Sequence, residues 1–325
     1  MARTVVGVLR GGISNEYPLS LKTGGAMLAE LPEHQFETKD ILIDRNGMWY
    51  MRGMPTDPAR AFSQVDVVLN GLHGGVGEDG TVQRLLERAS VPYYGSRALA
   101  SGLALNKIRS RELLQRAGVR MPRAVSFTSN SEIPTGDMAR AVFQEFGPPY
   151  LVKPSSEGAG YGIHYASNIV DLPDAIGDVL DAYGAAVIEE YVIGDEASVA
   201  ILQEFRGDAL YALPPAHVMV PKGATHLTFD AHHAGLLRHV CPSHFSHKEK
   251  EALIDIARAA HKALGMSHVS RSDIILTENG PYLLEINALP GLYQGASLPP
   301  MLESVGSSVS QYLQHVVALA RRRVY

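Results

Sequence analysis

Apolar residues in the first third of the chain fall into two short runs, each followed by glycines and then by a segment with helical spacing. The successive segments are 4–9, 11–12 and 19–31 in the first unit and 65–70, 71–80 and 81–88 in the second. Strands that alternate with helices in this way predict a parallel sheet. Ligands bind at the carboxyl ends of strands in such sheets, which is where both glycine loops are expected to lie.

The spacing of apolar residues along the chain changes after Pro92. Residues Leu103 to Ala117 follow a helical pattern, Gly118 is placed to end that helix in a left-handed conformation, and Pro122 follows soon after. We therefore expect a domain boundary near residue 96.

The rest of the chain mixes strands and helices in a different order. Apolar strands are predicted at 150–154, 186–188, 197–202, 272–276 and 282–287, and helices at 247–264 and at the C-terminus. The predicted fold class combines α/β and α+β in three units. They are an N-terminal parallel α/β domain (1–95), a central small lobe (96–187) and a C-terminal α+β lobe (188–325).

Composition narrows the class of protein. Hydrophobic residues make up 46% of the 325 residues and charged residues 19%, which is typical of a globular protein. The net charge of −5 argues against a nucleic-acid partner, and the basic run 321–323 complements the end of a helix. Cys241 is the single cysteine. With neither a signal-peptide pattern nor a run of about 18 apolar residues, we expect a cytoplasmic protein without a membrane partner.

A glycine-rich segment follows Lys153 and runs through residues 158–162. Glycines let several backbone N–H groups converge on an anion, and the lysine adds a point charge, so the segment is a candidate phosphate cradle. A flexible connection between strands is the alternative. The Gly-Lys-Ser/Thr sequence of a Walker A loop is absent.

Two predicted strands near the C-terminus carry oxygen ligands. Asp273 lies on one strand, and Glu285 and Asn287 lie on the next. Two carboxylates and an amide oxygen suit Mg²⁺, which completes its coordination with water and nucleotide phosphates. A solvated acidic face is the alternative, but the apolar neighbours of both acids make unpaired charge costly there.

These motifs, together with others in the same order, resemble the D-alanine–D-alanine ligase family of the ATP-grasp superfamily. The matching pieces span nearly the whole chain: 11–16 (GGISNE), 72–80 (LHGGVGEDG), 94–96 (YGS), 152–154 (VKP), 271–273 (RSD) and 285–291 (EINALPG). The resemblance implies an ATP-grasp fold, with ATP between the second and third units.

The resemblance also implies a reaction. ATP would phosphorylate the carboxylate of one amino acid, and the amine of a second would attack the acyl phosphate. The residues it assigns to ATP are Lys107 and Lys153 on the phosphates, Gly158, Ala159 and Gly160 in the glycine loop, and Glu189, Glu190, Val192 and Glu196 around adenine and ribose.

The remaining implied roles concern metal and substrates. Asp273, Glu285 and Asn287 would bind two Mg²⁺ ions, or Mn²⁺ in their place, which would stabilise the transferred phosphoryl group. The residues implied for the amino acids are Glu16 on the first ammonium with His73 beside it, Arg271 on the intermediate, Gly291 on the oxyanion, and Ser297 and Leu298 on the second carboxylate.

The chain departs from the family pattern in three places. Ala159 and Gly160 replace two serines, and an alanine cannot supply the hydroxyl that normally links the family glutamate to a lid tyrosine. One residue is inserted after Gly291, which shifts the register of Ser297. The third change lies in the expected lid loop, about 222–242.

This loop has His232 at the position of the family's lid tyrosine. The surrounding segment is rich in histidines: 226, 232, 233, 239 and 244. We expect His232 to replace the tyrosine, and because imidazole titrates near neutrality, it could make the choice of second substrate pH dependent. A histidine metal cluster is the alternative.

Three functional hypotheses follow. The first is a D-alanine–D-alanine ligase or close variant in peptidoglycan precursor synthesis, a homodimer whose small-molecule substrates are amino acids. The second is an ATP-grasp ligase for another amino acid, hydroxy acid or amine. The third is an ATP-binding module without catalysis, against which the retained residues 271, 273, 285 and 287 argue.

Overall fold

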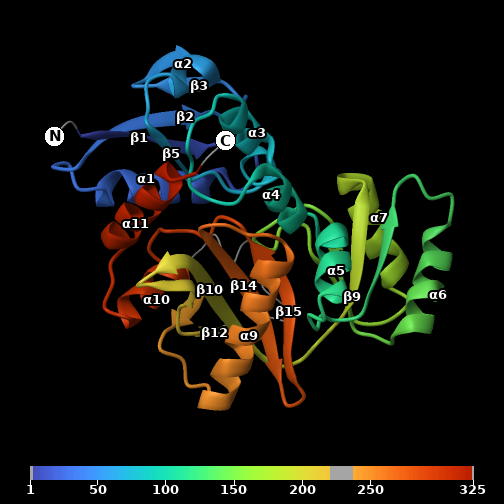
Figure 1. Cartoon of the computed structure of the whole chain (residues 1–325). Coiled ribbons are helices and arrows are strands. Elements are labelled where there is room, and N and C mark those ends of the chain that lie inside the picture. Colours follow the sequence, from blue (N-terminus) through green and yellow to red (C-terminus); the bar gives the residue numbers. More distant parts are fainter. Residues whose placement is uncertain (1–2, 220–236, 324–325) are drawn as a thin grey trace.

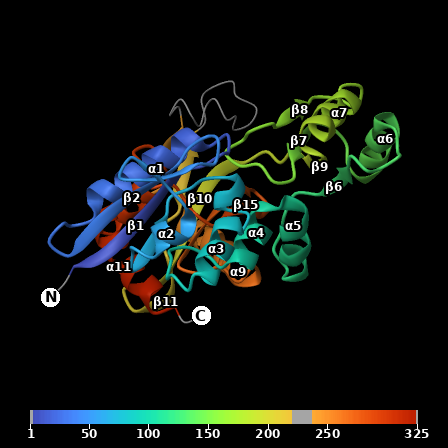
Figure 2. The ribbon, with the colours of Figure 1, turned by 90° about the horizontal axis from the view of Figure 1, so that it is seen from above.

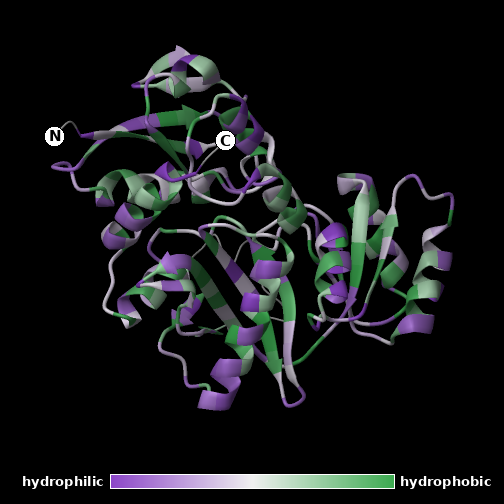
Figure 3. Cartoon of the chain, in the orientation of Figure 1, coloured by the Kyte–Doolittle hydropathy of each residue, from purple (hydrophilic) through white to green (hydrophobic). Residues whose placement is uncertain are grey.

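The computed structural model describes residues 3–219 and 237–323, which form three sheets (Figure 1). The sheets follow one another along the chain, and helices cover their faces. Apolar colour follows the strands, whereas the outward sides of several helices are hydrophilic (Figure 3). Within the described ranges, no helix combines the length and apolar character needed to cross a membrane.

The N-terminal sheet has the order β4-β3-β2-β1-β5. The parallel strands are β1 (Thr4–Gly11), β2 (Phe36–Ile43) and β5 (Val67–Asn70). All four residues of β5 are buried, as expected for a strand covered on both faces. The predicted parallel sheet is therefore confirmed, with β3 (Trp49–Met51) and β4 (Met54–Thr56) added as an antiparallel edge.

In its described residues, the N-terminal unit has three α-helices, of which the first and third follow the two glycine loops. They are α1 (Tyr17–Glu30), α2 (Pro58–Phe62) and α3 (Thr81–Arg88), with a short 3₁₀ turn η1 (Gly75–Gly77) before α3. The loops before α1 and α3 lie at the carboxyl ends of β1 and β5, where the parallel-sheet pattern places a ligand site.

The predicted helix 103–117 is wrong in its extent, because two helices occupy this region. α4 (Ala98–Leu105) and α5 (Lys107–Arg116) meet at Asn106, which has an extended backbone. The Asn106 side chain accepts a hydrogen bond from the backbone N–H of Arg109 at 3.0 Å and so caps α5.

The middle sheet is antiparallel, in the order β6-β9-β7-β8. Its strands are β6 (Ala124–Thr128), β7 (Tyr150–Pro154), β8 (His164–Ala166) and β9 (Ala185–Glu190), and its helices are α6 (Thr135–Glu145) and α7 (Leu172–Tyr183). This unit has its own apolar core, in which Val142 and Ile176 of the helices meet Val152 and Ile188 of the strands.

The C-terminal sheet has the order β13-β12-β10-β14-β15, with β11 beside β10. The strands are β10 (Asp195–Phe205), β11 (Asp208–Ala212), β12 (Ala216–Met219), β13 (Arg238–Val240), β14 (Val269–Thr277) and β15 (Gly280–Asn287). The helices are α9 (His247–Ala263), α10 (Leu298–Ser304) and α11 (Val309–Arg321). A capping box of Ser246 and Glu249 begins α9.

The first and last units share one apolar core. Val6 and Val67 of the N-terminal sheet belong to the same buried cluster as Val269 of β14 and Leu313 and Val316 of α11. Figure 2 shows α11 beside the N-terminal sheet and the middle sheet set apart. A second cluster joins Ala100 of α4 and Leu114 of α5 to the C-terminal sheet. The domain division at residues 95 and 187 stays a prediction. Strand β9 of the middle sheet runs past the second of these boundaries, to Glu190.

Candidate functional site

Two cavities meet between the units. A small one, of about 50 Å³, lies among the N-terminal glycine loops, α4 and the end of β15. A larger one, of about 420 Å³, lies between the middle and C-terminal sheets. Five residues line both cavities: Lys107, Glu157, Ala159, Arg271 and Glu285. The large cavity falls within the size range of small-molecule sites, and the shared wall allows a group to pass between two ligands.

The predicted acidic pair lies on two adjacent strands. Asp273 of β14 is directly opposite Glu285 of β15, and Arg271 is opposite Asn287. Asp273 accepts hydrogen bonds from Ser198 Oγ at 3.0 Å, Arg271 Nη2 at 2.7 Å and Asn287 Nδ2 at 3.1 Å. The sequence prediction that these side chains come together is thus borne out in geometry, while their metal role stays a prediction.

The pKa values of Asp273 and Glu285 are shifted in opposite directions. Burial raises the pKa of Asp273, and the charge of Glu285 adds to this against the opposing effect of Arg271. Burial also acts to raise the pKa of Glu285, but the charges of Lys107, Lys153 and Arg271 outweigh it, and the pKa falls below its ordinary value. The nearby cations therefore favour the charged form of Glu285 more than burial disfavours it.

The two predicted phosphate lysines point to different carboxylates. Lys107 Nζ lies 3.3 Å from Glu285 Oε2 and donates to the backbone oxygen of Glu157 at 2.6 Å. Lys153 Nζ donates to Glu189 Oε2 at 2.5 Å. The other oxygen of Glu189 accepts from Arg111 Nη1 at 2.8 Å. Both oxygens of Glu189 are thus engaged within the protein, next to the predicted nucleotide cavity.

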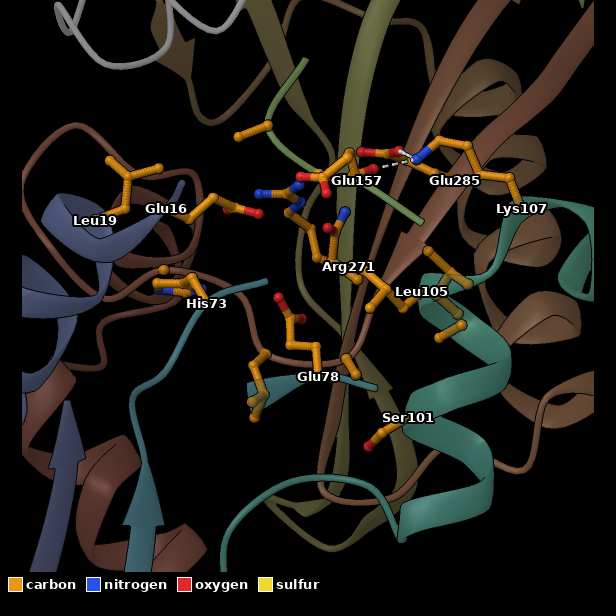
Figure 4. A pocket seen from close by; sticks show the side chains of 18 of the residues that line it. Glu16, Leu19, His73, Glu78, Ser101, Leu105, Lys107, Glu157, Arg271 and Glu285 are labelled. Carbon is orange, nitrogen blue, oxygen red and sulfur yellow. Dashed lines mark hydrogen bonds and ion pairs between the residues drawn. The ribbon is translucent and has the colours of Figure 1, made fainter. Parts of the chain in front are cut away.

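Glu16 projects from the start of α1 into the small cavity, toward Arg271 and Glu157 (Figure 4). A Cβ atom on Gly74 or on Gly158 would lie 2.7 Å from Glu16 Oε1, so glycines let two loops approach this carboxylate. Burial raises the pKa of Glu16 to about 8, and the nearby charge of Glu78 adds to the effect.

His73 and Glu78 also line the small cavity, with His73 close to Glu16 (Figure 4). His73 Nε2 lies 2.7 Å from the hydroxyl of Thr23. Glu78 Oε2 accepts from the backbone N–H of Gly74 at 2.7 Å. Burial raises the pKa of Glu78 to about 7, although the hydrogen bond from Gly74 and the charge of Arg271 act in the other direction.

The glycine-rich segment lies between the cavities. Gly158 lines the small cavity, Gly160 lines the large one, and Ala159 lines both. Ala159 has a φ of +50°, in the left-handed region that is rare for alanine. The Ser-to-Ala change predicted from the sequence therefore falls where the two cavities join.

The predicted adenine and ribose residues belong to the large cavity. Glu190, Val192 and Glu196 line it at and beyond the end of β9. Arg123 donates to Glu190 from Nε at 2.7 Å. Burial raises the pKa of Glu196 to about 7, with a further contribution from Asp273.

The segment after β15 is brought only partly into the site. Gly291 and Tyr293 line the small cavity, whereas Ser297 and Leu298 are buried at the start of α10 and do not line it. Ser297 Oγ has no hydrogen-bond partner among the described residues. The assignment of Ser297 and Leu298 to the second carboxylate stays a prediction.

Much of the predicted lid lies outside the described residues. The predicted catalytic residue His232 lies in that part of the lid, outside the described residues, and so do His226 and His233. His239 lines the large cavity, and His244 is exposed. In the ranges 3–219 and 237–323, no three His, Cys, Asp or Glu side chains are grouped to hold a metal by themselves.

Several residues of the site carried no role in the sequence interpretation. Glu78 stands inside the quoted string 72–80, and Glu157 stands between Lys153 and Gly158. Their position inside matching motifs could have singled them out. Arg111 and Tyr293 gave no comparable signal, because only the tertiary structure brings Arg111 to Glu189 and Tyr293 to the small cavity.

Similar proteins were found by sequence and by structure. A D-alanine–D-alanine ligase of Desulforudis audaxviator is 32% identical over 322 residues, covering 98% of this chain and 99% of that relative. One of Geobacter sulfurreducens is 32% identical over 324 residues, covering 99% and 95%. The D-alanine–D-alanine ligase of Bacillus anthracis complexed with ATP superposes with a TM-score of 0.81 at 26% identity, covering 98% of each chain.

Another solved structure, D-alanyl-alanine synthetase A of Vibrio cholerae, gives a TM-score of 0.88 at 25% identity and covers 99% of this chain and all of that one.

Fold and site together define an ATP-dependent ligase with the ATP-grasp fold. Family models described as D-ala D-ala ligase N-terminus and C-terminus match residues 52–96 and 113–318. The chain belongs to the D-alanine–D-alanine ligase family.

Proposed function

We propose that this ligase joins two D-alanine molecules through an acyl phosphate, with release of ADP and phosphate, to supply peptidoglycan precursors. One observation carries the proposal: the small and large cavities share the wall formed by residues 107, 157, 159, 271 and 285. A carboxylate in the small cavity and a nucleotide in the large one would meet at this wall. The sequence relatives named D-alanine–D-alanine ligase support the choice of substrate.

Asp273, Glu285 and Asn287 would hold two Mg²⁺ ions, or Mn²⁺. The amide nitrogen of Asn287 is spent on Asp273, so its amide oxygen is the atom suited to a metal. Burial and the nearby charge of Glu285 raise the pKa of Asp273, and a divalent cation between the two carboxylates would favour their charged forms. When bound, the ions would neutralise charge on the phosphates and so stabilise the transferred phosphoryl group.

Arg271 would bind the anionic phosphate of the intermediate. Its Nη2 donates to Asp273, but its buried Nε has no hydrogen-bond partner among the described residues. A buried donor left in this state favours an anionic ligand. Lys107 and Lys153 would contact the nucleotide phosphates, and Glu189 and Arg111 would hold Lys153 in place.

Glu16 would bind the ammonium group of the first amino acid. Four carboxylates line the small cavity, at positions 16, 78, 157 and 285, against the two cations Lys107 and Arg271. This excess of negative charge favours a ligand with an ammonium group. His73 would lie beside the bound ammonium, and the Gly291 N–H would face the developing oxyanion.

The reaction would follow from these positions. A carboxylate oxygen of the first amino acid attacks the γ-phosphorus, and ADP leaves. The amine of the second amino acid then attacks the acyl carbon, a proton is lost from nitrogen, and phosphate leaves. Holding both reactants at one wall lowers the entropic part of the barrier.

A second candidate function is favoured by the alanine at position 159. Because Ala159 has no hydroxyl to link Glu16 to a lid residue, the second-substrate side is free to accept another amino acid, a hydroxy acid or an amine. His232 of the lid would then help to select the second substrate. Ala159→Ser should restore a hydroxyl and change the preference between second substrates only modestly.

The assembly and the lobes are also part of the proposal. We expect a homodimer, a cytoplasmic location, and motion of the central lobe relative to the other two. The separate core of the middle sheet supports such motion, because few buried apolar contacts tie it to the rest.

The test is phosphate release from Mg·ATP by the purified protein, with D-alanine compared against panels of L- and D-amino acids and hydroxy acids. Products are identified by mass. D-alanyl-D-alanine as the main product is the expected result. Turnover with another pair alone would replace it with the second candidate, and ATP binding without turnover on any panel would indicate a non-catalytic module.

A further inference from the structure

An amine that attacks an acyl phosphate must first lose a proton, because an ammonium group has no lone pair with which to form a bond to carbon. The proposed reaction releases this proton but assigns no group to accept it. In that reaction the acyl carbon lies where the two cavities share a wall. A side chain that takes the proton from the attacking nitrogen must therefore belong to this wall or lie directly beside it.

Among the five described residues that line both cavities, Glu157 alone fits this task. Lys107 and Arg271 are cations, and Ala159 has no side-chain group that accepts a proton. Glu285 is a carboxylate, but Lys107 Nζ lies 3.3 Å from its Oε2, and its proposed role is to hold a metal. Glu157 is the remaining carboxylate of the shared wall.

Contacts from two other parts of the chain hold Glu157 at this place. Lys107, at the start of α5, donates to its backbone oxygen at 2.6 Å. The side chain of Asn15, in the loop before α1, donates a hydrogen bond to its carboxylate. In Figure 4, the side chains of Glu16 and Glu157 lie close to that of Arg271. A carboxylate has about four acceptor positions, so the bond from Asn15 leaves room for a substrate N–H.

The surroundings make Glu157 a stronger base than an exposed glutamate. Burial raises the pKa of Glu157, against the charge of Lys107 and the hydrogen bond from Asn15. The other titratable groups that act on it electrostatically are Glu16 at the start of α1 and Tyr183 at the end of α7. A carboxylate with a raised pKa holds a proton more firmly, so it accepts one from an ammonium group at a lower energetic cost.

We propose that Glu157 is the catalytic base that takes a proton from the ammonium group of the second amino acid. This inference rests on the proposed function, because it requires an amine to attack the acyl phosphate at the shared wall. One proton passes from nitrogen to a carboxylate oxygen of Glu157, and the freed lone pair forms the C–N bond. The C–O bond to the phosphate then breaks, its electron pair leaves with the phosphate, and the phosphate takes the second proton from nitrogen.

The experiment compares two nucleophiles, D-alanine and hydroxylamine, in Glu157→Gln and in the wild type, with Mg·ATP and with D-alanine as the first substrate. Hydroxylamine is uncharged near neutral pH and needs no base before it attacks, whereas D-alanine arrives as an ammonium ion. Dipeptide and alanine hydroxamate are measured by mass. In Glu157→Gln, dipeptide formation should fall at least about a hundredfold, as for loss of a general base, and hydroxamate formation should stay within about threefold.

Two further variants serve as controls. Glu157→Asp keeps a carboxylate and should recover part of the dipeptide rate. Glu145→Gln changes an exposed glutamate at the end of α6, in the same unit, and should match the wild type with both nucleophiles. Because hydroxamate formation needs a folded protein and a working first step, it also shows that Glu157→Gln has kept its structure.

The outcomes separate the inference from the proposed function. An unchanged dipeptide rate in Glu157→Gln would overturn the inference, and so would an equal loss of dipeptide and hydroxamate, since a base for the ammonium ion affects the dipeptide alone. A wild type that joins a different amine would overturn the choice of D-alanine only, and the same comparison with that amine would then test Glu157. A wild type that joins no amine would overturn both.

Discussion

The Oε1 atom of Glu16 lies 2.7 Å from the point that a Cβ atom on Gly158 would occupy. Glu16 comes from the start of α1, and Gly158 from the glycine-rich loop of the middle unit. This approach joins the N-terminal and central units at the carboxylate proposed to hold the first amino acid, and it leaves no space for a side chain at position 158.

Gly158→Ala should therefore displace Glu16 or the loop. We expect kcat/KM for the amino acid to fall by roughly a hundredfold, because small misplacements in a site cost about this much. ATP binding, measured by calorimetry, should change less. Gly136→Ala is the control, since a Cβ there has no atom within 4 Å. Unchanged kinetics in Gly158→Ala would show that Glu16 has room to move.

Glu285→Gln removes one negative charge from the predicted metal site and keeps the side-chain shape. Phosphate release from Mg·ATP should fall by at least about a hundredfold, because loss of a ligand weakens the metal that stabilises the phosphoryl group. Glu278→Gln, on the exposed turn between β14 and β15, should retain full activity. A Glu285→Gln protein that works at the wild-type rate would contradict the metal assignment.

The raised pKa of Glu16 makes stability depend on pH. The folded chain binds this proton more tightly than the unfolded chain, with a pKa of about 8 against 4.5. The resulting stabilisation is complete below pH 4.5 and is lost as pH rises through about 8. Without substrate, the free energy of unfolding should fall by on the order of a few kcal/mol between about pH 6 and pH 9. The melting temperature should fall with it.

Glu16→Gln should reduce this dependence, because the amide does not ionise. The measurement is the melting temperature of both proteins at the two pH values. Glu30→Gln, on the exposed end of the same helix, should keep the wild-type dependence. An equal fall in all three proteins would assign the effect to other groups.

In the described part of the chain, Arg111→Ala leaves the buried Glu189 with one charged hydrogen-bond partner, Lys153. Removing one partner of a buried charge group costs about 3–5 kcal/mol. We expect a melting temperature lower by roughly 10 °C, since 1 kcal/mol corresponds to about 2–4 °C in proteins of this size class. Arg109→Ala changes an exposed arginine of the same helix and should have little effect. Equal melting temperatures would contradict a stabilising role for the Arg111–Glu189 pair.

The features that the sequence predicted well depend on local pattern. The apolar run of β5 identified a strand buried on both faces, and the glycines after it identified a loop at its carboxyl end. Asp273 and Glu285 were expected to lie together because they stand on two successive predicted strands, and these strands pair directly. In each case the residues that carry the signal lie close together along the chain.

The features that were missed depend on contacts between distant segments. Arg111 meets Glu189 across 78 positions, and Tyr293 meets Lys22 of α1 across most of the chain. No spacing rule links such residues. The break between α4 and α5 was missed for a different reason, because it depends on one residue, Asn106, whose extended backbone separates the helices and whose side chain caps the start of α5.

The core shared by the N-terminal sheet and α11 bears on the order in which the protein can fold during synthesis. Val6 and Val67 are made early, whereas Leu313 and Val316, which cover them, leave the ribosome last. One face of the N-terminal sheet therefore stays exposed until nearly the whole polypeptide has emerged. The middle sheet, whose core is formed by residues between 125 and 188, can close while translation continues.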